Sequence, residues 1–214
     1  MATRIIAITG PSGSGKSYLA QALHQEVKAT LPHLSIETLA EDSYYHDQAD
    51  VPVKQRQDVN YDHPSALEHD LMLEHLQQLK SGQAVEVPAY DYSRHTRSEE
   101  SRLLHPVSLL IVEGILLLSH HRLRQHFDLR LFVDTPLDVC LARRMERDIR
   151  ERGRSPESVQ QQFESTVRPM FHAHIEPTRD HAHMVLSGEE PVSDLAARIR
   201  REIEAQGYLP DQAE

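Results

Sequence analysis

The segment GPSGSGKS (residues 10–17) holds three of the eight glycines in the chain and matches the pattern G-x-x-x-x-G-K-[ST] in full. Glycines at these spacings let backbone N–H groups curl around a phosphate, and a helix that begins directly afterwards adds partial positive charge. The lysine can reach the β- and γ-phosphates, and the following serine can hold Mg²⁺. The motif therefore predicts a nucleotide-binding loop made of Gly10, Pro11, Ser12, Gly13, Ser14, Gly15, Lys16 and Ser17.

Acidic side chains follow two of the segments that read as strands. Glu113 is the only charged residue in SLLIVEGILLL (residues 108–118), and a carboxylate in such a run needs a partner, which Mg²⁺ and its waters would supply beside a phosphate loop. EDSYYHD (residues 41–47) follows an earlier strand, where an alcohol acceptor could give its proton to Asp42 or Glu41. Adjacent residues of an extended segment point in opposite directions, so we expect one of the two to face the site.

Six arginines fall within twelve residues of a chain whose formal net charge is −10: Arg143, Arg144, Arg147, Arg150, Arg152 and Arg154. One interpretation is a solvated helix whose arginines pair with Glu146, Asp148 and Glu151, and it suits Arg143 and Arg150. The other is a mobile lid that starts near Gly153 and covers the phosphates of a nucleotide with arginines.

Composition restricts the class of protein. A length of 214 residues suits one domain with a small insertion, and a net charge of −10 argues against nucleic acid as a partner. The single cysteine excludes an intrachain disulfide and fits a reducing cytoplasm, while no apolar run is long enough for a membrane helix or a signal peptide. The fifteen histidines lack the thiolate partners and helical spacing of a zinc site.

Buried strands are predicted to alternate with helices along the chain. Apolar, β-rich runs predict strands over residues 4–10, 33–40, 106–118, 128–134 and 183–186, and an alternating pattern predicts a small hairpin from residue 84. Helical patterns follow Ser17 and cover residues 64–82, 135–153, 155–171 and 194–205. We expect a capping box at Ser65 and Glu68, an N-cap at Thr135 and helix ends at Gly82 and Gly153, with no clear period over residues 41–63.

This order of elements predicts an α/β fold of the P-loop NTPase type, with three layers and a central parallel sheet. We expect one domain over residues 1–214, with a β-hairpin insertion for the acceptor at about 83–105 and an Arg-rich helical lid at about 143–170. The chain has no Asn/Thr-Lys-x-Asp guanine-reading motif, so a switch GTPase is disfavoured. A kinase that acts on a small acceptor is favoured.

Seven segments, in order from the N-terminus to about Leu186, resemble the uridine kinase (uridine–cytidine kinase) family in its bacterial form: GPSGSGKS, EDSYYHD, NYDHPSA, VPAYDYSRHTR, VEGILLL, FVDTPLDVCLARRMERDIRERGRS and VRPMF. The resemblance implies a cytoplasmic, Mg²⁺-dependent enzyme of pyrimidine salvage. Such an enzyme transfers the γ-phosphate of ATP or GTP to the 5′-hydroxyl of uridine or cytidine and gives UMP or CMP. The resemblance also implies a homotetramer that CTP and UTP inhibit.

The resemblance also implies a role for individual residues. Asp42 would be the general base, and Ser17, Asp42 and Glu113 would surround Mg²⁺. Phosphates would be contacted by Lys16, Arg147 and Arg152. The nucleoside would be bound through its ribose by Asp62 and Arg144, through its base by Tyr90 and His95, and within a pocket completed by Tyr45, Tyr61, Tyr92, Arg154 and Gln162.

Three questions stay open from the sequence. The segment LSGEEPVSD (residues 186–194) stands where the family tends to have a Pro-Arg-Gly-Gly-like loop, so the choice between ATP and GTP is undecided. Periodicity alone allows Tyr90 and Tyr92 to be ordinary strand packing rather than contacts to a flat ligand. A kinase of another alcohol, such as ribulose phosphate or pantothenate, and a nucleotide-dependent binding switch are the competing functions.

Overall fold

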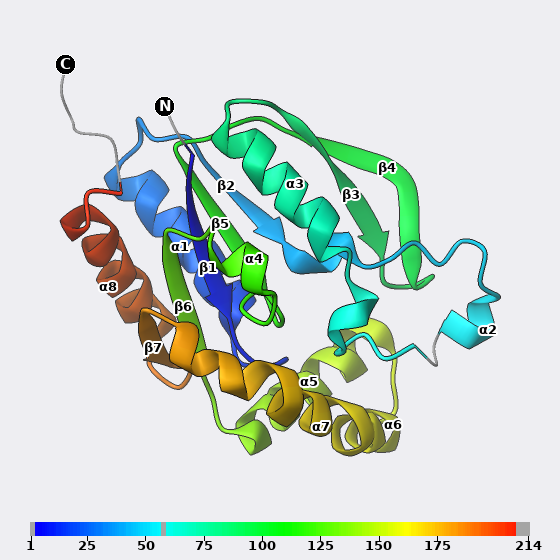
Figure 1. The fold of residues 1–214 in the computed structure, drawn as a ribbon. Coiled ribbons are helices and arrows are strands. Elements are labelled where there is room, and N and C mark those ends of the chain that lie inside the picture. Colours follow the sequence, from blue (N-terminus) through cyan, green and yellow to red (C-terminus); the bar gives the residue numbers. More distant parts are fainter. Residues whose placement is uncertain (1–2, 57–58, 209–214) are drawn as a thin grey trace.

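A computed structural model describes residues 3–56 and 59–208, so the first two, the last six and residues 57–58 of the predicted domain lie outside the described part. Its centre is a sheet of five parallel strands in the order β2-β5-β1-β6-β7 (Figure 1). The strands are β1 (Arg4–Thr9), β2 (Ile36–Ala40), β5 (Leu109–Gly114), β6 (Leu129–Asp134) and β7 (Met184–Ser187). The predicted parallel sheet is therefore confirmed.

The central strands are buried on both faces because helices cover both sides of the sheet. Ile5 to Ile8 of β1 and Leu109 to Val112 of β5 are all fully buried. Alternate residues of each strand enter different cores, so Ile5 packs on one side and Ile6 on the other. Continuous apolar runs are typical of such strands, which have no solvent-facing side.

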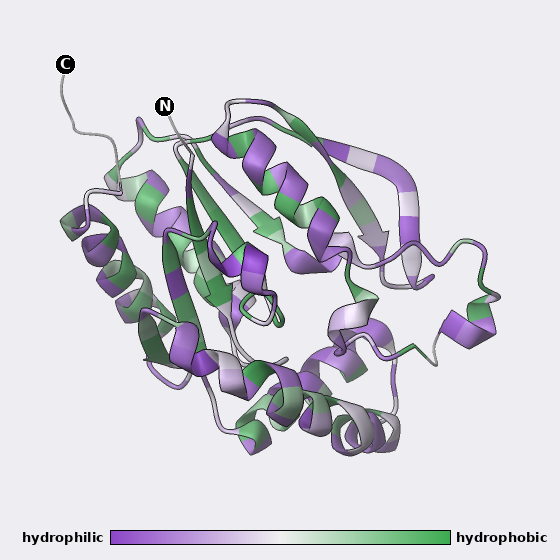
Figure 2. Ribbon diagram, in the orientation of Figure 1, coloured by the Kyte–Doolittle hydropathy of each residue, from purple (hydrophilic) through white to green (hydrophobic). Residues whose placement is uncertain are grey.

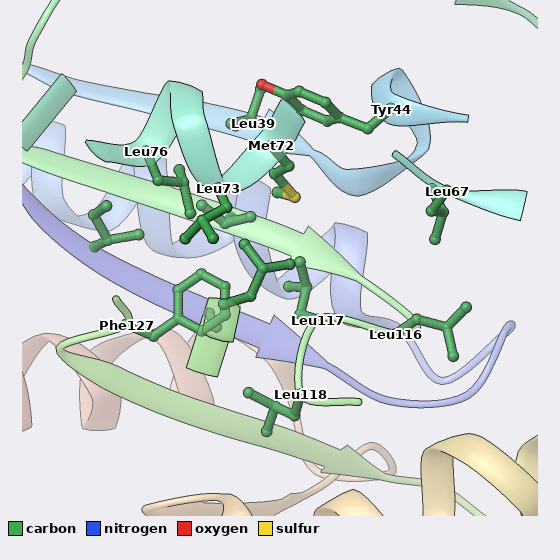
Figure 3. Packing of buried hydrophobic residues seen from close by; sticks show 14 of the residues in the cluster. Leu39, Tyr44, Leu67, Met72, Leu73, Leu76, Leu116, Leu117, Leu118 and Phe127 are labelled. Carbon is green, nitrogen blue, oxygen red and sulfur yellow. The ribbon is translucent and has the colours of Figure 1, made fainter. Parts of the chain in front are cut away.

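The two faces of the sheet carry different helices. On one face lie α1 (Lys16–Thr30) and α8 (Val192–Ala205), which contact each other along their length (Figure 1). On the other lie α3 (His69–Lys80) and α4 (His121–Arg124). Figure 3 shows this second core, where Met72, Leu73 and Leu76 of α3 pack against Leu116, Leu117 and Phe127. Figure 2 shows apolar colours concentrated in the central sheet and on the inward sides of the helices, whereas the hairpin strand β4 is mostly hydrophilic.

The predicted hairpin is present as a separate two-stranded antiparallel sheet, β3 (Val85–Asp91) and β4 (Thr96–Leu104). It packs beside α3 and beside a short 3₁₀ turn at Glu41–Tyr44 (Figure 1). Asp91 pairs with Thr96 at its tip, and His95 there has a φ of 52°, in the left-handed region that few residues other than glycine adopt. The hairpin thus brings its tip to the carboxyl end of β2.

A long helical segment follows the sheet strand β6. It consists of α5 (Leu137–Arg152), α6 (Pro156–Gln162), a π-helical turn (Phe163–Val167), α7 (Arg168–Met170), a second π-helical turn (Phe171–Ile175) and a 3₁₀ turn (Glu176–His181). Gly153 separates α5 from α6 and has a φ of 63°, as the predicted helix end requires. Ser155 caps α6 by accepting a hydrogen bond from the Ser158 N–H.

Two predicted helix caps are wrong. The helix expected from residue 64 begins at His69 after a 3₁₀ turn (Pro64–Ala66). Glu68 occupies the N-cap position, but its side chain accepts no hydrogen bond from the helix N–H groups. Ser65 instead donates its N–H to the ring of His63. Thr135 does not cap α5, because its hydroxyl donates to the Ser14 carbonyl at 3.0 Å. A tertiary contact has taken Thr135 from its local role, whereas Ser65 is bound by His63, two residues earlier in the chain.

Arg56 helps to hold the described part of residues 41–63, the segment expected to lack a period. This segment includes the short helix α2 (Val53–Arg56). The buried Arg56 guanidinium donates to the carbonyls of Val51, Ala49 and Arg94 at 2.7 to 3.1 Å. These bonds join the segment to the hairpin tip, and this long-range link has no signal in the sequence pattern. Over the described residues, no helix is both long enough and apolar enough to cross a membrane.

Candidate active site

The phosphate loop joins β1 to α1 as the motif predicts. Gly10, Gly13 and Gly15 all have positive φ values, of 151°, 88° and 98°, which place backbone N–H groups around the loop. A Cβ atom on Gly13 would collide with the Cys140 carbonyl of α5, so this glycine also permits close packing. The Ser14 carbonyl accepts hydrogen bonds from Thr135 and Arg143, which fix the loop from outside.

A cleft of about 580 Å³ opens beside this loop. Its walls are the phosphate loop with the start of α1, the exposed side of α5, and the connection between β7 and α8. The lining residues include Lys16, Ser17, Tyr18, Arg143, Arg147, Gly188, Glu190 and Val192. The cleft can take a nucleotide whose phosphates lie at the helix N-terminus. Residues 186–194, which differ from the loop typical of the resembling family, therefore border this cleft.

Glu41 and Asp42 have separate environments, which decides between the two predicted acids. Glu41 is fully buried, and its carboxylate accepts from the His69 ring and from the Leu116 N–H, both at 2.8 Å. Asp42 is partly exposed and accepts a hydrogen bond from the Tyr92 hydroxyl at 2.9 Å. Asp42 is therefore the acid that faces the space between the sheet and the hairpin.

Glu113 lies at the end of β5, beside the phosphate loop. Its carboxylate accepts a hydrogen bond from the Ser17 hydroxyl at 3.0 Å. Burial raises the pKa of Glu113 above its usual range, and the charge of Lys16 opposes that rise. Hydroxyl and carboxylate oxygens are the donors that Mg²⁺ prefers, so Ser17, Glu113 and the Asp42 carboxylate fit the predicted metal site by the chemistry of their oxygens.

The predicted nucleoside-binding tyrosines form one aromatic cluster. Tyr45 lies 5.2 Å from Tyr61 and 5.1 Å from Tyr90 between ring centroids. The His95 ring stacks on Tyr61 at 5.5 Å with an interplanar angle of 22°, and Tyr92 lies 5.3 Å from Tyr90. These residues come from the segment after β2, the segment before α3, and the hairpin, so they are brought together only by the fold.

The surroundings of the His95 imidazole favour its neutral form. Burial lowers the pKa of His95, and the charges of Arg152, Arg154 and Arg56 lower it further. A neutral imidazole carries one donor and one acceptor nitrogen.

Arg144 contacts the phosphate loop, and its charge acts on the buried carboxyl group of Asp62. Asp62 is 7% exposed, and burial raises the pKa of its carboxyl group while the Arg144 charge opposes the rise. Arg144 donates to the Ser12 hydroxyl at 2.8 Å and to the Gln162 side-chain oxygen at 3.0 Å. Arg154 donates to the same oxygen of Gln162, so this amide joins the two arginines.

The arginine run divides between the two interpretations. Arg150 pairs with Glu146 and Glu151, as expected for a solvated helix. Arg143 does not pair with an acid of α5; it donates to the carbonyls of Ser14 and Gly188. That expectation was wrong because Arg143 points toward the phosphate loop.

Two arginines of the run reach predicted site residues. Arg147 lines the cleft beside the phosphate loop. The Arg152 guanidinium lies over the Tyr92 ring, 5.3 Å from its centroid, and so connects the end of α5 with the hairpin.

Three features of the site were missed in the sequence. They are the buried pair of Glu41 and His69, the buried carboxylate of Asp148 among the arginines, and the Arg56 link to the hairpin tip. For Glu41 and Asp148 the signal is weak, because an acid in a polar loop or on a charged helix is usually solvated. Only long-range packing buries them.

Small-molecule kinases need a phosphate loop, a nearby carboxylate and cations close to the transferred group. The phosphate loop and Arg147 line the cleft, and Glu113 joins them through its hydrogen bond with Ser17. The parallel sheet and the phosphate loop are those of a P-loop kinase. A model of the Phosphoribulokinase / Uridine kinase family matches residues 5–208. The chain belongs to this family and is a phosphotransferase.

Named relatives and solved structures agree with this assignment. The uridine kinases of Erwinia tasmaniensis and Yersinia enterocolitica are 49% and 50% identical to the chain over 182 residues, which is 85% of this chain and 85% of each relative. D-glycerate 3-kinase from Cryptococcus neoformans has a TM-score of 0.62 at 19% identity, over 84% of this chain and 80% of its own. A possible uridine kinase from Bacillus stearothermophilus has a TM-score of 0.55 at 19% identity, over 87% and 90%. The solved structures support the fold alone.

Proposed function

We propose that the protein transfers the γ-phosphate of ATP or GTP to the 5′-hydroxyl of uridine and cytidine and so produces UMP and CMP for pyrimidine salvage. The observation that carries this proposal is the cluster of Tyr45, Tyr61, Tyr90, Tyr92 and His95 next to Asp42. Aromatic rings and a neutral imidazole suit a flat heterocycle, while the adjacent carboxylate suits an alcohol. The 49–50% identity to proteins named uridine kinase supports the same acceptor.

In the proposed reaction Asp42 accepts the proton of the 5′-hydroxyl as that oxygen bonds to the γ-phosphorus. The bond from the γ-phosphorus to the bridging oxygen of the β-phosphate breaks, so the products are the nucleoside monophosphate and ADP or GDP. Lys16 and Arg147 stabilise the negative charge on the transferring group. Mg²⁺, when it is held by Ser17, Asp42 and Glu113, would supply further neutralisation of the phosphate oxygens.

Recognition of the nucleoside is assigned to three groups. Asp62 can accept hydrogen bonds from both vicinal hydroxyls of a ribose, which would select against deoxyribose. His95 can donate or accept according to its tautomer, so it can serve both uracil and cytosine. Tyrosine rings stack on either pyrimidine because stacking depends little on the identity of the base. Arg144, Arg154 and Gln162 support the substrate side.

A sugar-phosphate acceptor is disfavoured because two arginines beside the aromatic cluster are already engaged and a third, Arg152, lies over the Tyr92 ring. Such an acceptor needs a free cation for its own phosphate. Arg56 is bound to three backbone carbonyls, and Arg97 of the hairpin forms an ion pair with Glu68. The aromatic cluster would also have no purpose for an acceptor without a ring.

The test is a coupled turnover assay with ATP and with GTP against six acceptors: uridine, cytidine, thymidine, adenosine, ribulose 5-phosphate and pantothenate. We expect uridine and cytidine to stimulate consumption of the donor, and the other four to have little effect. Stimulation by ribulose 5-phosphate or pantothenate alone would replace the proposed acceptor. Absence of stimulation by any of them would favour a binding switch instead.

A further inference from the structure

Asp148 lies at the centre of the arginine cluster and is fully buried. Arg147 donates a hydrogen bond from Nε to its Oδ1 atom at 2.9 Å, and the Nη2 atom of the same guanidinium lies 2.8 Å from that oxygen in an ion pair. Three further guanidiniums surround the same carboxylate: Arg144 at 3.5 Å, Arg152 at 3.6 Å and Arg154 at 3.7 Å. One buried carboxylate is therefore the common partner of four arginines from both sides of Gly153.

The backbone of the same residue gathers part of this cluster. α5 ends at Gly153 in the left-handed conformation, and the N–H groups of Gly153 and Arg154 both bond to the Asp148 carbonyl. This turn returns the chain toward the helix, so that Arg154 reaches the carboxylate from beyond the helix end. The Asp148 carbonyl therefore fixes the backbone of Arg154, and the Asp148 carboxylate contacts the guanidinium of the same arginine.

The cluster has an excess of positive charge. Four guanidiniums against one carboxylate leave three positive charges, and Arg144 and Arg147 of this group adjoin the phosphate loop or its cleft. Charge of this kind suits the phosphates of a nucleotide. Asp148 itself is covered by the arginines and has no exposed surface with which to meet a ligand.

We propose that Asp148 is a positioning residue for phosphoryl transfer. Its two-point contact fixes the Arg147 guanidinium at the cleft, and its other contacts hold Arg144, Arg152 and Arg154 around the same carboxylate. The arginines therefore meet the transferring phosphate already oriented, which lowers the reorganisation that transfer requires. This inference rests on the proposed phosphate role of Arg147.

The alternative is that Asp148 only stabilises the helix. A buried carboxylate among arginines would stabilise the fold in either case, so loss of activity in one variant does not separate the two roles. The coupling between two substitutions does separate the two roles. If Asp148 acts through Arg147, replacing Asp148 lowers the activity less when Arg147 is already absent.

The test is a double-mutant cycle on kcat with Asp148→Asn, Arg147→Ala and the double variant, at saturating donor and acceptor. We expect Asp148→Asn to lower kcat about 10- to 100-fold, the range for a misplaced catalytic group. The double variant should lose at least about 5-fold less activity than the product of the two single losses. Losses that multiply to within about 2-fold would overturn the proposal.

A second variant keeps the buried carboxylate paired and so avoids a folding defect. Arg147→Lys retains the charge but cannot make the two-point contact with Asp148. We expect its kcat to fall to within about 3-fold of that of Arg147→Ala. A kcat within about 2-fold of wild type would show that orientation by Asp148 is not needed.

The matched control lies on the same helix. Asp138 also pairs with one arginine, Arg168 at 3.6 Å, but its side chain is 93% exposed. Asp138→Asn should leave kcat within about 2-fold of wild type. If the wild-type protein ignores uridine and cytidine, the proposed function fails, and the cycle is measured with whichever acceptor supports turnover. The two proposals can therefore fail separately.

Discussion

At the scale of single residues, neighbours in sequence can have unrelated roles. Glu41 and Asp42 are adjacent acids, yet one is fully buried against His69 and the other meets the Tyr92 hydroxyl. From the sequence the two were alternatives, because a strand-end acid can face either way. The 3₁₀ turn that starts at Glu41 separates them.

The proposed base makes the first prediction. Asp42→Asn should lower kcat by at least about 100-fold, because the amide cannot accept the proton of the alcohol. Binding of the donor nucleotide, measured by calorimetry, should remain. Asp50→Asn, at an exposed position of the same segment, should keep kcat near wild type. A near-normal kcat for the Asp42 variant would remove this residue as the base.

His95 gives a prediction for pH. Burial and the nearby arginines lower the pKa of His95 below that of an ordinary histidine, so the ring remains neutral at pH values where an ordinary histidine takes up a proton. We expect KM for uridine to be flat from about pH 8 down to about 6.5 and to rise only below that range. His95→Ala should raise KM for uridine strongly, remove this dependence and leave KM for the donor nearly unchanged. A rise in KM centred above pH 6.5 in wild type would contradict the assignment.

At the scale of elements, the strands whose sequence has a single clear hydrophobic pattern were predicted correctly. β1 and β5 were identified because an unbroken apolar run needs two covered faces, and the hairpin because its residues alternate. The predicted cap at Thr135 was wrong because its side chain has a distant partner: the Thr135 hydroxyl donates to the Ser14 carbonyl. Spacing along the sequence indicates which nearby backbone groups a side chain could bind, so it cannot indicate a partner that is distant in the sequence.

The turn after β2 provides a stability prediction. His69 at the start of α3 holds the buried Glu41 carboxylate, which also accepts from the Leu116 N–H. His69→Ala should lower the free energy of unfolding by about 2 to 4 kcal/mol, because a buried acceptor loses its donor. The measurement is urea unfolding, with the exposed His33→Ala as control, expected within about 0.5 kcal/mol of wild type. Equal stability of both variants would show that the pair contributes little.

At the scale of the whole molecule, the family resemblance identified more of the site than periodicity could. Tyr45, Tyr61, Tyr90 and His95 lie on three separate segments, and only knowledge of how such segments fold predicts that their rings meet. Pairing of Asp148 with arginines was expected on a solvated helix, but the burial of its carboxylate was not, because a charged helix normally faces water. Of the four guanidiniums around its carboxylate, three come from α5 and one, that of Arg154, from the segment after Gly153.

Assembly gives one further prediction. The resemblance implies a homotetramer in the cytoplasm that CTP and UTP inhibit. Sedimentation equilibrium should therefore give a mass four times that of the 24.5 kDa chain. The same sample, assayed with uridine at low concentration, should lose activity when CTP or UTP is added. A monomeric mass in an active sample would contradict the tetramer without affecting the proposed reaction.

The most direct measurement is the identity of the product formed from uridine. The protein is incubated with Mg²⁺ and ATP or GTP, with uridine or 5′-deoxyuridine, and the products are resolved by ³¹P NMR. The proposed reaction predicts a new 5′-monophosphate resonance and one diphosphate per uridine consumed, with no transfer to 5′-deoxyuridine. Phosphate on another hydroxyl, or no uridine-dependent turnover with either donor, would contradict it.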